Sequence, residues 1–148
     1  MAIYFYRQDE QPYGCFSNFF AGCPVNLDGL EWPTVEHYFQ AQKFPGHPEI
    51  QEEIRRADWA GLTKRIVRKH SDLVDWSWWD GVRGAVMMKA LRAKFSQHER
   101  LRDILLSTGD EELVEHTVND RYWADGGDGS GMNMLGKMLM KVRTELSD

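Results

Sequence analysis

A short run of polar side chains near residue 40 has the residue types and the spacing that catalysis uses. Glu36, Gln40 and Lys43 follow one another at intervals of four and three residues. On a helix, this spacing places them within an arc of roughly 60°. A carboxylate and an amine that line one pocket can act as acid, base or nucleophile. The spacing alone also fits a stripe of surface charge that faces water, so both interpretations stay open at this point.

A glycine-rich loop is the second candidate. Residues 120–131 read DRYWADGGDGSG and lead into a predicted helix. Glycines allow the positive φ angles that such a loop needs, and we expect the junction with the helix to present open backbone N–H groups that suit a phosphate. The plainer alternative is a loop in solvent. The spacing of an EF-hand calcium loop is absent.

Ser17 and Asn18 form a weaker, third candidate. They lie between aromatic residues in the segment YGCFSNF, residues 13–19, which could hold a base or a sugar, although core packing explains aromatic residues as well. The histidines are scattered without the spacing of a metal site, so we expect no metal ligand. The two cysteines, Cys15 and Cys23, are expected to be reduced thiols.

The elements that must position these residues follow from local signals. Asp28-Gly29 predicts the turn of a hairpin over residues 24–32. Thr34 is a suitable N-cap for a helix that runs to about Phe44, where Pro45 and Gly46 stop it. The other expected elements are strands at residues 3–6 and 113–117 and helices beginning at Pro48, from a cap at Asp58 through Arg68, and over residues 77–95, 99–107 and 133–146.

The helix expected over residues 77–95 is apolar on two sides. Such a helix is packed from both faces, so we place it, buried, at the centre of the fold. The predicted fold class is α+β and mostly helical, with a small sheet and hairpin, in a single domain over residues 1–148.

Charge and hydropathy narrow the function classes. The net charge of -5 argues against a general nucleic-acid-binding surface, although two or three local cations suffice for a small phosphorylated ligand. No apolar run approaches the ~20 residues of a membrane span. The N-terminal residues MAIYFYRQDEQ do not form a signal peptide. A cytoplasmic location is therefore expected.

Motifs spread over nearly the whole chain resemble the NADAR family, whose bacterial members include YbiA-like N-glycosidases. They are F-x-N-F (16–19), W-P-T-x-E-H-Y-F-Q-A-x-K-F (32–44), A-L-R-A-K-F (90–95), L-V-E-H-T (113–117), Y-W-x-D-G (122–126) and G-x-N-x-L-G-x-x-L-M (131–140). The long W-P-T-x-E-H segment is highly specific. One departure is Ala124, where the family is expected to have glycine.

The resemblance implies hydrolysis of a bond between a sugar C1 atom and nitrogen. YbiA-like members cleave ribosylamino-uracil phosphates, which are early riboflavin-pathway intermediates, and other members remove ADP-ribose from guanine. The implied substrate is a small phosphorylated ribosyl compound, and nucleic acid enters only as an ADP-ribosylated substrate. The reaction needs no metal and no redox cofactor. A non-catalytic module that binds ADP-ribose or NAD is a further alternative.

The resemblance also implies roles for residues. Glu36 and Asp125 are the expected catalytic carboxylates, with the acid and the base left unassigned. Lys43 either binds phosphate or, with a lowered pKa, attacks the opened sugar as a Schiff base. The expected substrate-binding residues are Ser17, Asn18, Phe19, Trp32, Gln40, Tyr122, Trp123, Gly126, Gly127 and Asn133. We expect all three segments to converge on one pocket; the sequence leaves the oligomeric state and the true cellular substrate open.

Overall fold

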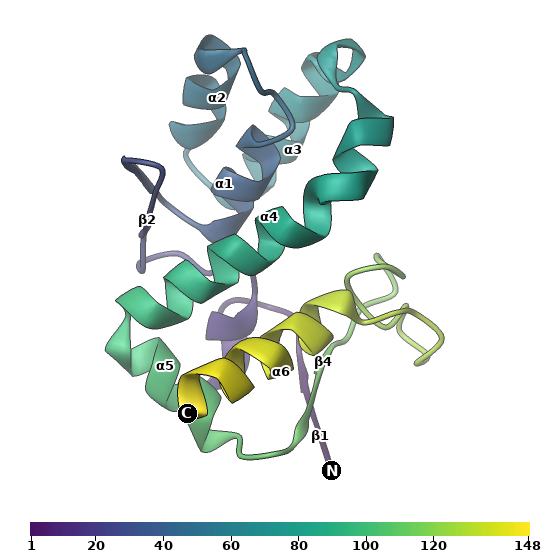
Figure 1. Cartoon of the computed structure of the whole chain (residues 1–148). Helices are drawn as coiled ribbons and strands as arrows, with labels where there is room; N and C mark the ends of the chain where they lie inside the picture. The colour runs from purple at the N-terminus through teal and green to yellow at the C-terminus, as the bar shows by residue number, and fades with distance from the viewer. The chain divides into compact units, whose positions relative to one another are not determined.

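The structure is a computed structural model that describes residues 1–148. It contains two compact units. Unit 2 is one continuous segment, Ala21–Lys94, and unit 1 combines the flanking segments Met1–Phe20 and Phe95–Asp148. Helices predominate and the strands are short (Figure 1), which confirms the predicted mostly helical α+β class. The single domain over residues 1–148 stays a prediction.

Unit 2 begins with the hairpin that the Asp-Gly dipeptide predicted. Strand β2 (Val25–Leu27) pairs antiparallel with β3 (Leu30–Trp32). Between them, Asp28 and Gly29 have φ angles of 55° and 80°. Two successive positive φ angles are what a two-residue hairpin turn requires, and Asp-Gly adopts them at low cost.

Helix α1 (Val35–Ala41) follows directly and begins where the sequence predicted. The Thr34 side chain accepts a hydrogen bond from the His37 N–H at 3.1 Å, which is the expected N-cap. The helix ends three residues before Phe44, because its last turn tightens. The N–H groups of Lys43 and Phe44 bond to carbonyls three residues back rather than four.

Two further helices, α2 (Pro48–Arg55) and α3 (Ala60–Lys69), pack against α1, and a short 3₁₀ turn, η2 (Ser71–Leu73), follows α3. Pro48 begins α2 as predicted. The expected cap of α3 at Asp58 is wrong: the cap position is Trp59, in an extended conformation with no side-chain hydrogen bond. The segment between α2 and α3 is bonded to α1, since His37 Nε2 lies 3.0 Å from the Ala57 carbonyl oxygen.

The longest helix, α4 (Trp76–Gln97), covers the predicted range 77–95. Both predicted apolar stripes contribute buried residues to its second half, among them Met88, Ala90 and Leu91. In the first turn, Trp79 is buried as predicted, whereas Trp76 and Trp78 are 45% and 40% exposed. None of the helices is long and apolar enough to cross a membrane.

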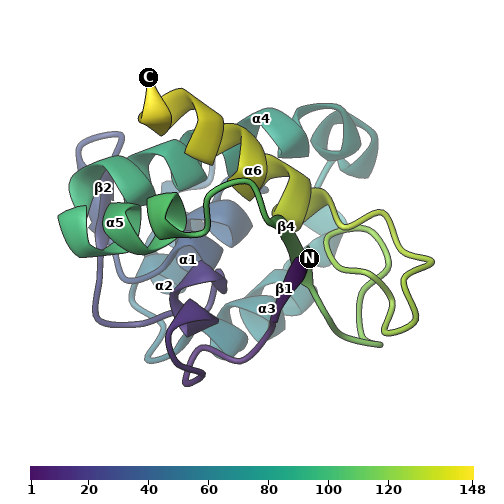
Figure 2. The ribbon, with the colours of Figure 1, turned by 90° about the horizontal axis from the view of Figure 1, so that it is seen from below.

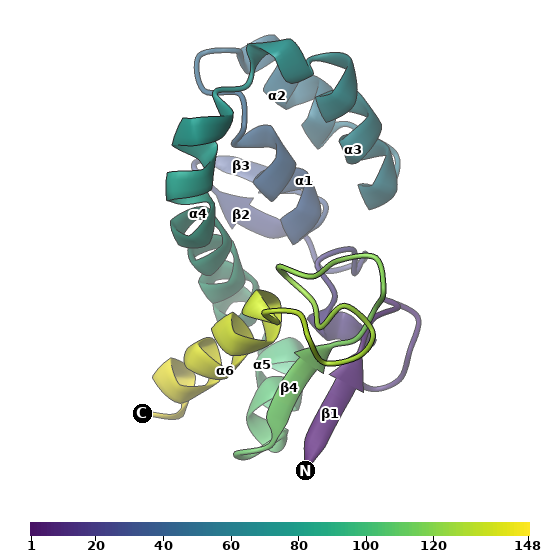
Figure 3. The same ribbon diagram turned by 90° about the vertical axis from the view of Figure 1, so that its right-hand side faces the viewer.

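Unit 1 is built on a pair of parallel strands that are far apart in the chain. Strand β1 (Ala2–Phe5) pairs with β4 (Glu112–Glu115), and Figure 3 shows them side by side with the same direction. A short 3₁₀ helix, η1 (Tyr13–Phe16), follows β1.

Helices α5 (Glu99–Ser107) and α6 (Met134–Ser147) pack against each other, and α6 also packs against β4 (Figure 2). The approach of α6 to the strand is close. A Cβ atom on Gly136 would lie 2.0 Å from the Leu113 carbonyl oxygen, so only glycine fits there.

Candidate active site

The polar stripe of α1 is buried rather than solvated. Glu36 is 6% exposed and Gln40 is 5% exposed. The Gln40 amide donates a hydrogen bond of 2.7 Å from Nε2 to the Glu36 carboxylate. A buried carboxylate costs folding free energy unless it is paired or used, so this burial favours the catalytic interpretation over a surface stripe.

Gln40 has a second feature that points to a ligand. A carboxylate only accepts hydrogen bonds, so the Gln40 nitrogen must face Glu36 and the amide orientation is fixed. Its Oε1 atom is then buried without a hydrogen-bond partner in the protein. Buried acceptors are nearly always satisfied. This oxygen is therefore available to a hydroxyl or N–H group of a bound ligand.

Lys43 lies in an aromatic enclosure just beyond the end of α1. Its Nζ atom lies 5.8 Å from the ring centre of Phe39, 5.4 Å from Trp76 and 5.7 Å from Trp79. Within about 6 Å, such ring faces attract an ammonium group. The rings also exclude water from the amine, and this desolvation lowers its pKa.

Burial lowers the pKa of Lys43 from its ordinary 10.5 to about 8. The negative charge of Glu36 opposes this change, and the positive charges of Lys64 and Arg83 reinforce it. At neutral pH, a lysine with this pKa has about one tenth of its molecules in the free-amine form, ~300 times more than an ordinary lysine. Lys43 is thus prepared to act as a nucleophile.

Trp32, a predicted substrate-binding residue, is instead engaged in holding the hairpin. It is 3% exposed, donates from Nε1 to the Leu27 carbonyl at 3.1 Å and meets Tyr38 edge to face. A flat ligand has no access to its ring faces. Trp76, one of the exposed tryptophans of this unit, also contacts Lys43. Sequence reasoning missed it, although the segment WSWW at residues 76–79 was a visible signal.

In unit 1, the segment after η1 holds the other small polar candidates. Ser17 and Asn18 are buried, and Phe19 is half-buried. The Ser17 hydroxyl accepts a hydrogen bond from the Phe19 N–H at 3.1 Å. This local turn fixes the backbone on either side of Asn18.

Tyr122 and Trp123 open the glycine-rich loop and are held as a pair. Their N–H groups both donate to one oxygen of Asp120, at 2.9 and 2.8 Å. The two rings meet edge to face with their centres 4.8 Å apart. Both side chains are half-buried, so each keeps some surface for a ligand.

Asp125 is the most fully bonded of the predicted catalytic residues. Its Oδ1 atom accepts from the N–H groups of Thr117 at 3.1 Å and Gly127 at 2.8 Å, and its Oδ2 atom lies 2.7 Å from His116 Nδ1. Burial raises the pKa of Asp125, but the hydrogen bonds from His116, Gly127 and Thr117 outweigh it and hold the pKa below 3.8. The carboxylate therefore anchors the loop and fixes the His116 ring.

The expectation of open N–H groups before α6 is wrong. The N–H groups of Met134 and Leu135 already donate to the carbonyls of Tyr122 and Trp123, both at 3.0 Å. The residues that follow the loop thus bond to the residues at its start. These bonds use the backbone N–H groups that a phosphate would need.

Asn133 is likewise engaged. It has a positive φ of 52°, and its side-chain amide accepts from the Glu115 N–H at 3.0 Å and donates to the Leu113 carbonyl at 2.9 Å. The Asn133 side chain thus makes two hydrogen bonds to the backbone of β4, as a neighbouring strand would. Gly126 and Gly127 shape the loop through φ angles of 74° and 87°.

The predicted residues thus fall into two groups. Glu36, Gln40 and Lys43 belong to unit 2, as does Trp32. Those of unit 1 are Ser17, Asn18, Phe19, Tyr122, Trp123, Asp125, Gly126, Gly127 and Asn133. The convergence of both groups on one pocket stays a prediction.

Comparison with known proteins shows the family. The model of the NADAR domain matches residues 4–147. The chain belongs to the NADAR family. It is 50% identical over 145 residues to the N-glycosidase YbiA of Shigella boydii, which covers 98% of this chain and 88% of the relative.

Two more NADAR relatives are informative. A riboflavin biosynthesis protein of Vibrio vulnificus is 44% identical over 146 residues, covering 99% of this chain and 39% of that protein. The NMR structure of Escherichia coli YbiA has a TM-score of 0.88 and 49% identity, covering 99% of this chain and 85% of that one. The NADAR fold of this chain is therefore the α+β fold of YbiA.

Ala124, where glycine is expected for the NADAR family, lies in the interior. Ala124 is fully buried, and its carbonyl accepts the Asn133 N–H at 3.0 Å. The extra methyl group therefore packs inside the loop and leaves the hydrogen bonds of Asp125 intact.

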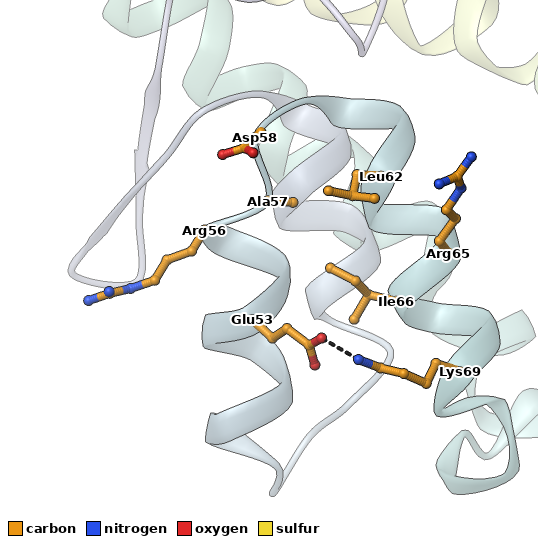
Figure 4. A pocket seen from close by; sticks show the side chains of 8 residues that line it. All are labelled: Glu53, Arg56, Ala57, Asp58, Leu62, Arg65, Ile66 and Lys69. Atoms are coloured by element: carbon orange, nitrogen blue, oxygen red, sulfur yellow. Dashed lines mark hydrogen bonds and ion pairs between the residues drawn. The ribbon is translucent and has the colours of Figure 1, made fainter.

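A separate groove between α2 and α3 contains none of the NADAR candidates. Its lining residues are Glu53, Arg56, Ala57, Asp58, Leu62, Arg65, Ile66 and Lys69. Figure 4 shows the Lys69 side chain directed at Glu53, to which it forms an ion pair, while Arg56 and Arg65 point outward. Its central charges satisfy each other, so the groove is not the candidate site.

Proposed function

We propose that this chain is an N-glycosidase that hydrolyses the ribose C1–N bond of ribosylamino-uracil phosphates, early intermediates of riboflavin synthesis. The observation that carries the proposal is the Lys43 amine, with its pKa of about 8, in an aromatic enclosure and under the electrostatic influence of the buried carboxylate of Glu36. The names of the relatives, N-glycosidase and riboflavin biosynthesis protein, support the reaction and the substrate class.

Lys43 acts as the nucleophile in this proposal. A ribosylamine opens readily to an imine at C1, with the ring oxygen becoming a hydroxyl group. The neutral amine adds to C1, the C1–N bond to the amino-uracil breaks, and the leaving nitrogen departs as an amine after taking up a proton. The lysine–sugar Schiff base then adds water, which releases the sugar phosphate and restores the amine.

Glu36 supplies the negative charge that this sequence needs. C1 and the attacking nitrogen become positive as the adduct forms, and a preorganised carboxylate in a low-dielectric site stabilises that charge strongly. The same carboxylate can take a proton from the attacking water in the second half of the reaction. Gln40 orients Glu36 and offers its free oxygen to a ribose hydroxyl.

The unit 1 residues have ligand-binding chemistry of their own. Tyr122 and Trp123 offer aromatic surface for the uracil ring, a contact worth roughly 1–3 kcal/mol in comparable sites. Asp125 acts by fixing His116. Because the carboxylate accepts the Nδ1 proton, the Nε2 atom of His116 is the one that can bond to a ligand.

Borohydride trapping tests the nucleophile directly. Wild-type protein treated with substrate and borohydride is expected to gain a reduced sugar phosphate on Lys43, located by peptide mass analysis. The variant Lys43→Arg keeps the charge and should gain nothing. Turnover of the wild type without any trapped adduct would count against Lys43 as the nucleophile.

A parallel assay distinguishes the competing activities. Removal of ADP-ribose from guanine uses the same C1–N chemistry, so wild-type protein is tested on both substrates, with Glu36→Gln as the matched inactive variant. Faster turnover of the ADP-ribosylated guanine would replace the proposed substrate. Tight binding of ADP-ribose with no turnover of either substrate would indicate a binding module.

A further inference from the structure

The phosphate of the proposed substrate needs a binding site that the glycine-rich loop does not supply. The N–H groups at the start of α6 are bonded to loop carbonyls, and those of Gly127 and Ser130 are bonded to Asp125 and Asp128. Lys43 is committed to the aromatic rings and to the sugar. These donors are not available to an anion, and positive side chains are the stronger alternative.

Two such groups lie close to Lys43 in unit 2. Trp76, Trp79 and Arg83 follow one another along α4 at intervals of three and four residues, so they share one face of that helix. Trp76 and Trp79 on this face contact the Lys43 ammonium. The same face therefore presents Arg83 beside the enclosure.

Lys64 approaches from the opposite helix. It lies in α3, which packs against α1, and Figure 3 shows α1 between α3 and α4. Lys64 and Arg83 are both near enough to disfavour a proton on Lys43 electrostatically. Two further cations, on α3 and α4, thus act on the Lys43 amine together with one carboxylate, Glu36, in a chain whose net charge is -5.

Like charges gathered around a partly desolvated site repel one another, and an anionic ligand removes that cost. We propose that Arg83 and Lys64 form the binding site for the 5-phosphate of a ribosyl substrate, which places C1 of the sugar against Lys43. An Arg–phosphate contact is directional and bidentate, whereas a lysine contributes a point charge. This inference rests on the proposed function and names the phosphate-binding end of the same site.

The two ends of the ribose make the arrangement chemically useful. The phosphate is on C5 and the reacting bond is at C1, so an anchor at one end leaves the other free to open and react. Arg83 also has an ion-pair contact to the exposed carboxylate of Asp80, at 4.0 Å. Such a long contact with an exposed carboxylate is weak.

The test compares phosphorylated and dephosphorylated ribosylamino-uracil with full-length variants. Arg83→Gln is expected to raise KM for the phosphorylated substrate roughly 10- to 100-fold, and Lys64→Gln by a smaller factor. On the dephosphorylated substrate, neither variant should change KM. Loss of either charge raises the pKa of Lys43, so any fall in kcat at neutral pH should be the same on both substrates. The matched control is Arg65→Gln, which removes the same charge from the next position on α3, at the groove between α2 and α3.

Equal KM changes on both substrates, or no change on either, would overturn the assignment. So would an Arg65→Gln effect as large as those of the two site variants, because the attraction would then be diffuse. Binding of ribose 5-phosphate, followed by tryptophan fluorescence, separates this test from the proposed reaction. A wild type that binds ribose 5-phosphate through Arg83 but turns over neither substrate supports the phosphate site and refutes the proposed function.

Discussion

Replacing Lys43 with methionine is expected to make the protein more stable at pH 7 while abolishing its catalysis. Methionine keeps an unbranched side chain that packs against the rings of Phe39, Trp76 and Trp79, but it brings no charge into the enclosure. The wild-type amine is desolvated by burial. The folded wild type therefore loses free energy by keeping a charged amine away from water, and the variant does not.

The size of the gain follows from the pKa of Lys43. Lowering it from 10.5 to about 8 means that the charged form is disfavoured in the folded state by about 3 kcal/mol. The ammonium group regains about 1 kcal/mol from the aromatic rings. The expected net stabilisation by methionine at pH 7 is thus about 2 kcal/mol.

The pH dependence of this gain has a definite sign. Below pH 8, Lys43 is protonated in both the folded and the unfolded states, so the cost is fully present. Between pH 8 and 10.5 the folded state loses its proton first, and the advantage of the variant declines with rising pH. Above 10.5 the amine is neutral in both states and the advantage is gone.

Urea unfolding of wild type, Lys43→Met and Lys43→Arg at pH 6, 7, 9 and 10 measures these differences. Arginine stays charged across this range, so it should give no gain at any of these pH values. If Lys43→Met were no more stable than the wild type at pH 7, the amine would not be desolvated. The argument for Lys43 as a nucleophile would then fail with it.

Four further outcomes are expected. The value of kcat/KM should rise with pH up to about 8 and then level off, because attack needs the neutral amine of Lys43; a flat profile over pH 6–8 contradicts this. Glu36→Gln should reduce kcat roughly 100-fold or more with an unchanged circular dichroism spectrum, and a rate within tenfold of wild type would remove Glu36 from the mechanism. Asp125→Asn should reduce turnover and lower the free energy of unfolding by about 1–3 kcal/mol at pH 7. This difference should shrink as the pH falls through the lowered pKa of Asp125. If the stability of both proteins fell equally with acid, the Asp125 carboxylate would not stabilise the fold. Gly136→Ala should destabilise by roughly 3 kcal/mol or more, because its Cβ would meet the Leu113 carbonyl, whereas Gly81→Ala, in open space on α4, should stabilise slightly in thermal unfolding; similar effects of both would refute this packing.

Local chemistry made much of unit 2 predictable. The Asp28-Gly29 turn and the Thr34 cap each depend on a few adjacent atoms, so the residue types alone identify them. The predicted end of α1 near Phe44 is too late. The last turn has hydrogen bonds to carbonyls three residues back, which the sequence does not reveal. The burial of Glu36 was also unpredictable, because helical spacing describes one face without saying what covers it.

Non-local pairing was out of reach. The sequence of residues 2–5 does not indicate that they pair with Glu112–Glu115. Parallel strands are not joined by a short hairpin turn, so no turn motif marks this pair. The loop before α6 misled in a different way: its glycines suggested open N–H groups, but carbonyls of Tyr122 and Trp123 already accept those bonds. Trp76 was missed because it lies just before the helix predicted over residues 77–95, whereas α4 begins at Trp76.

The pairing of β1 with β4 has a consequence for how the chain is made. During synthesis, the first strand leaves the ribosome long before Glu112 exists, and all of Ala21–Lys94 is produced in between. Throughout that interval the segment Ile3-Tyr4-Phe5 has an unpaired edge and exposes Phe5, which the finished protein buries. A nascent chain stalled before β4 is therefore prone to aggregation, and this ends only when Glu112–Glu115 has been synthesised and pairs with β1.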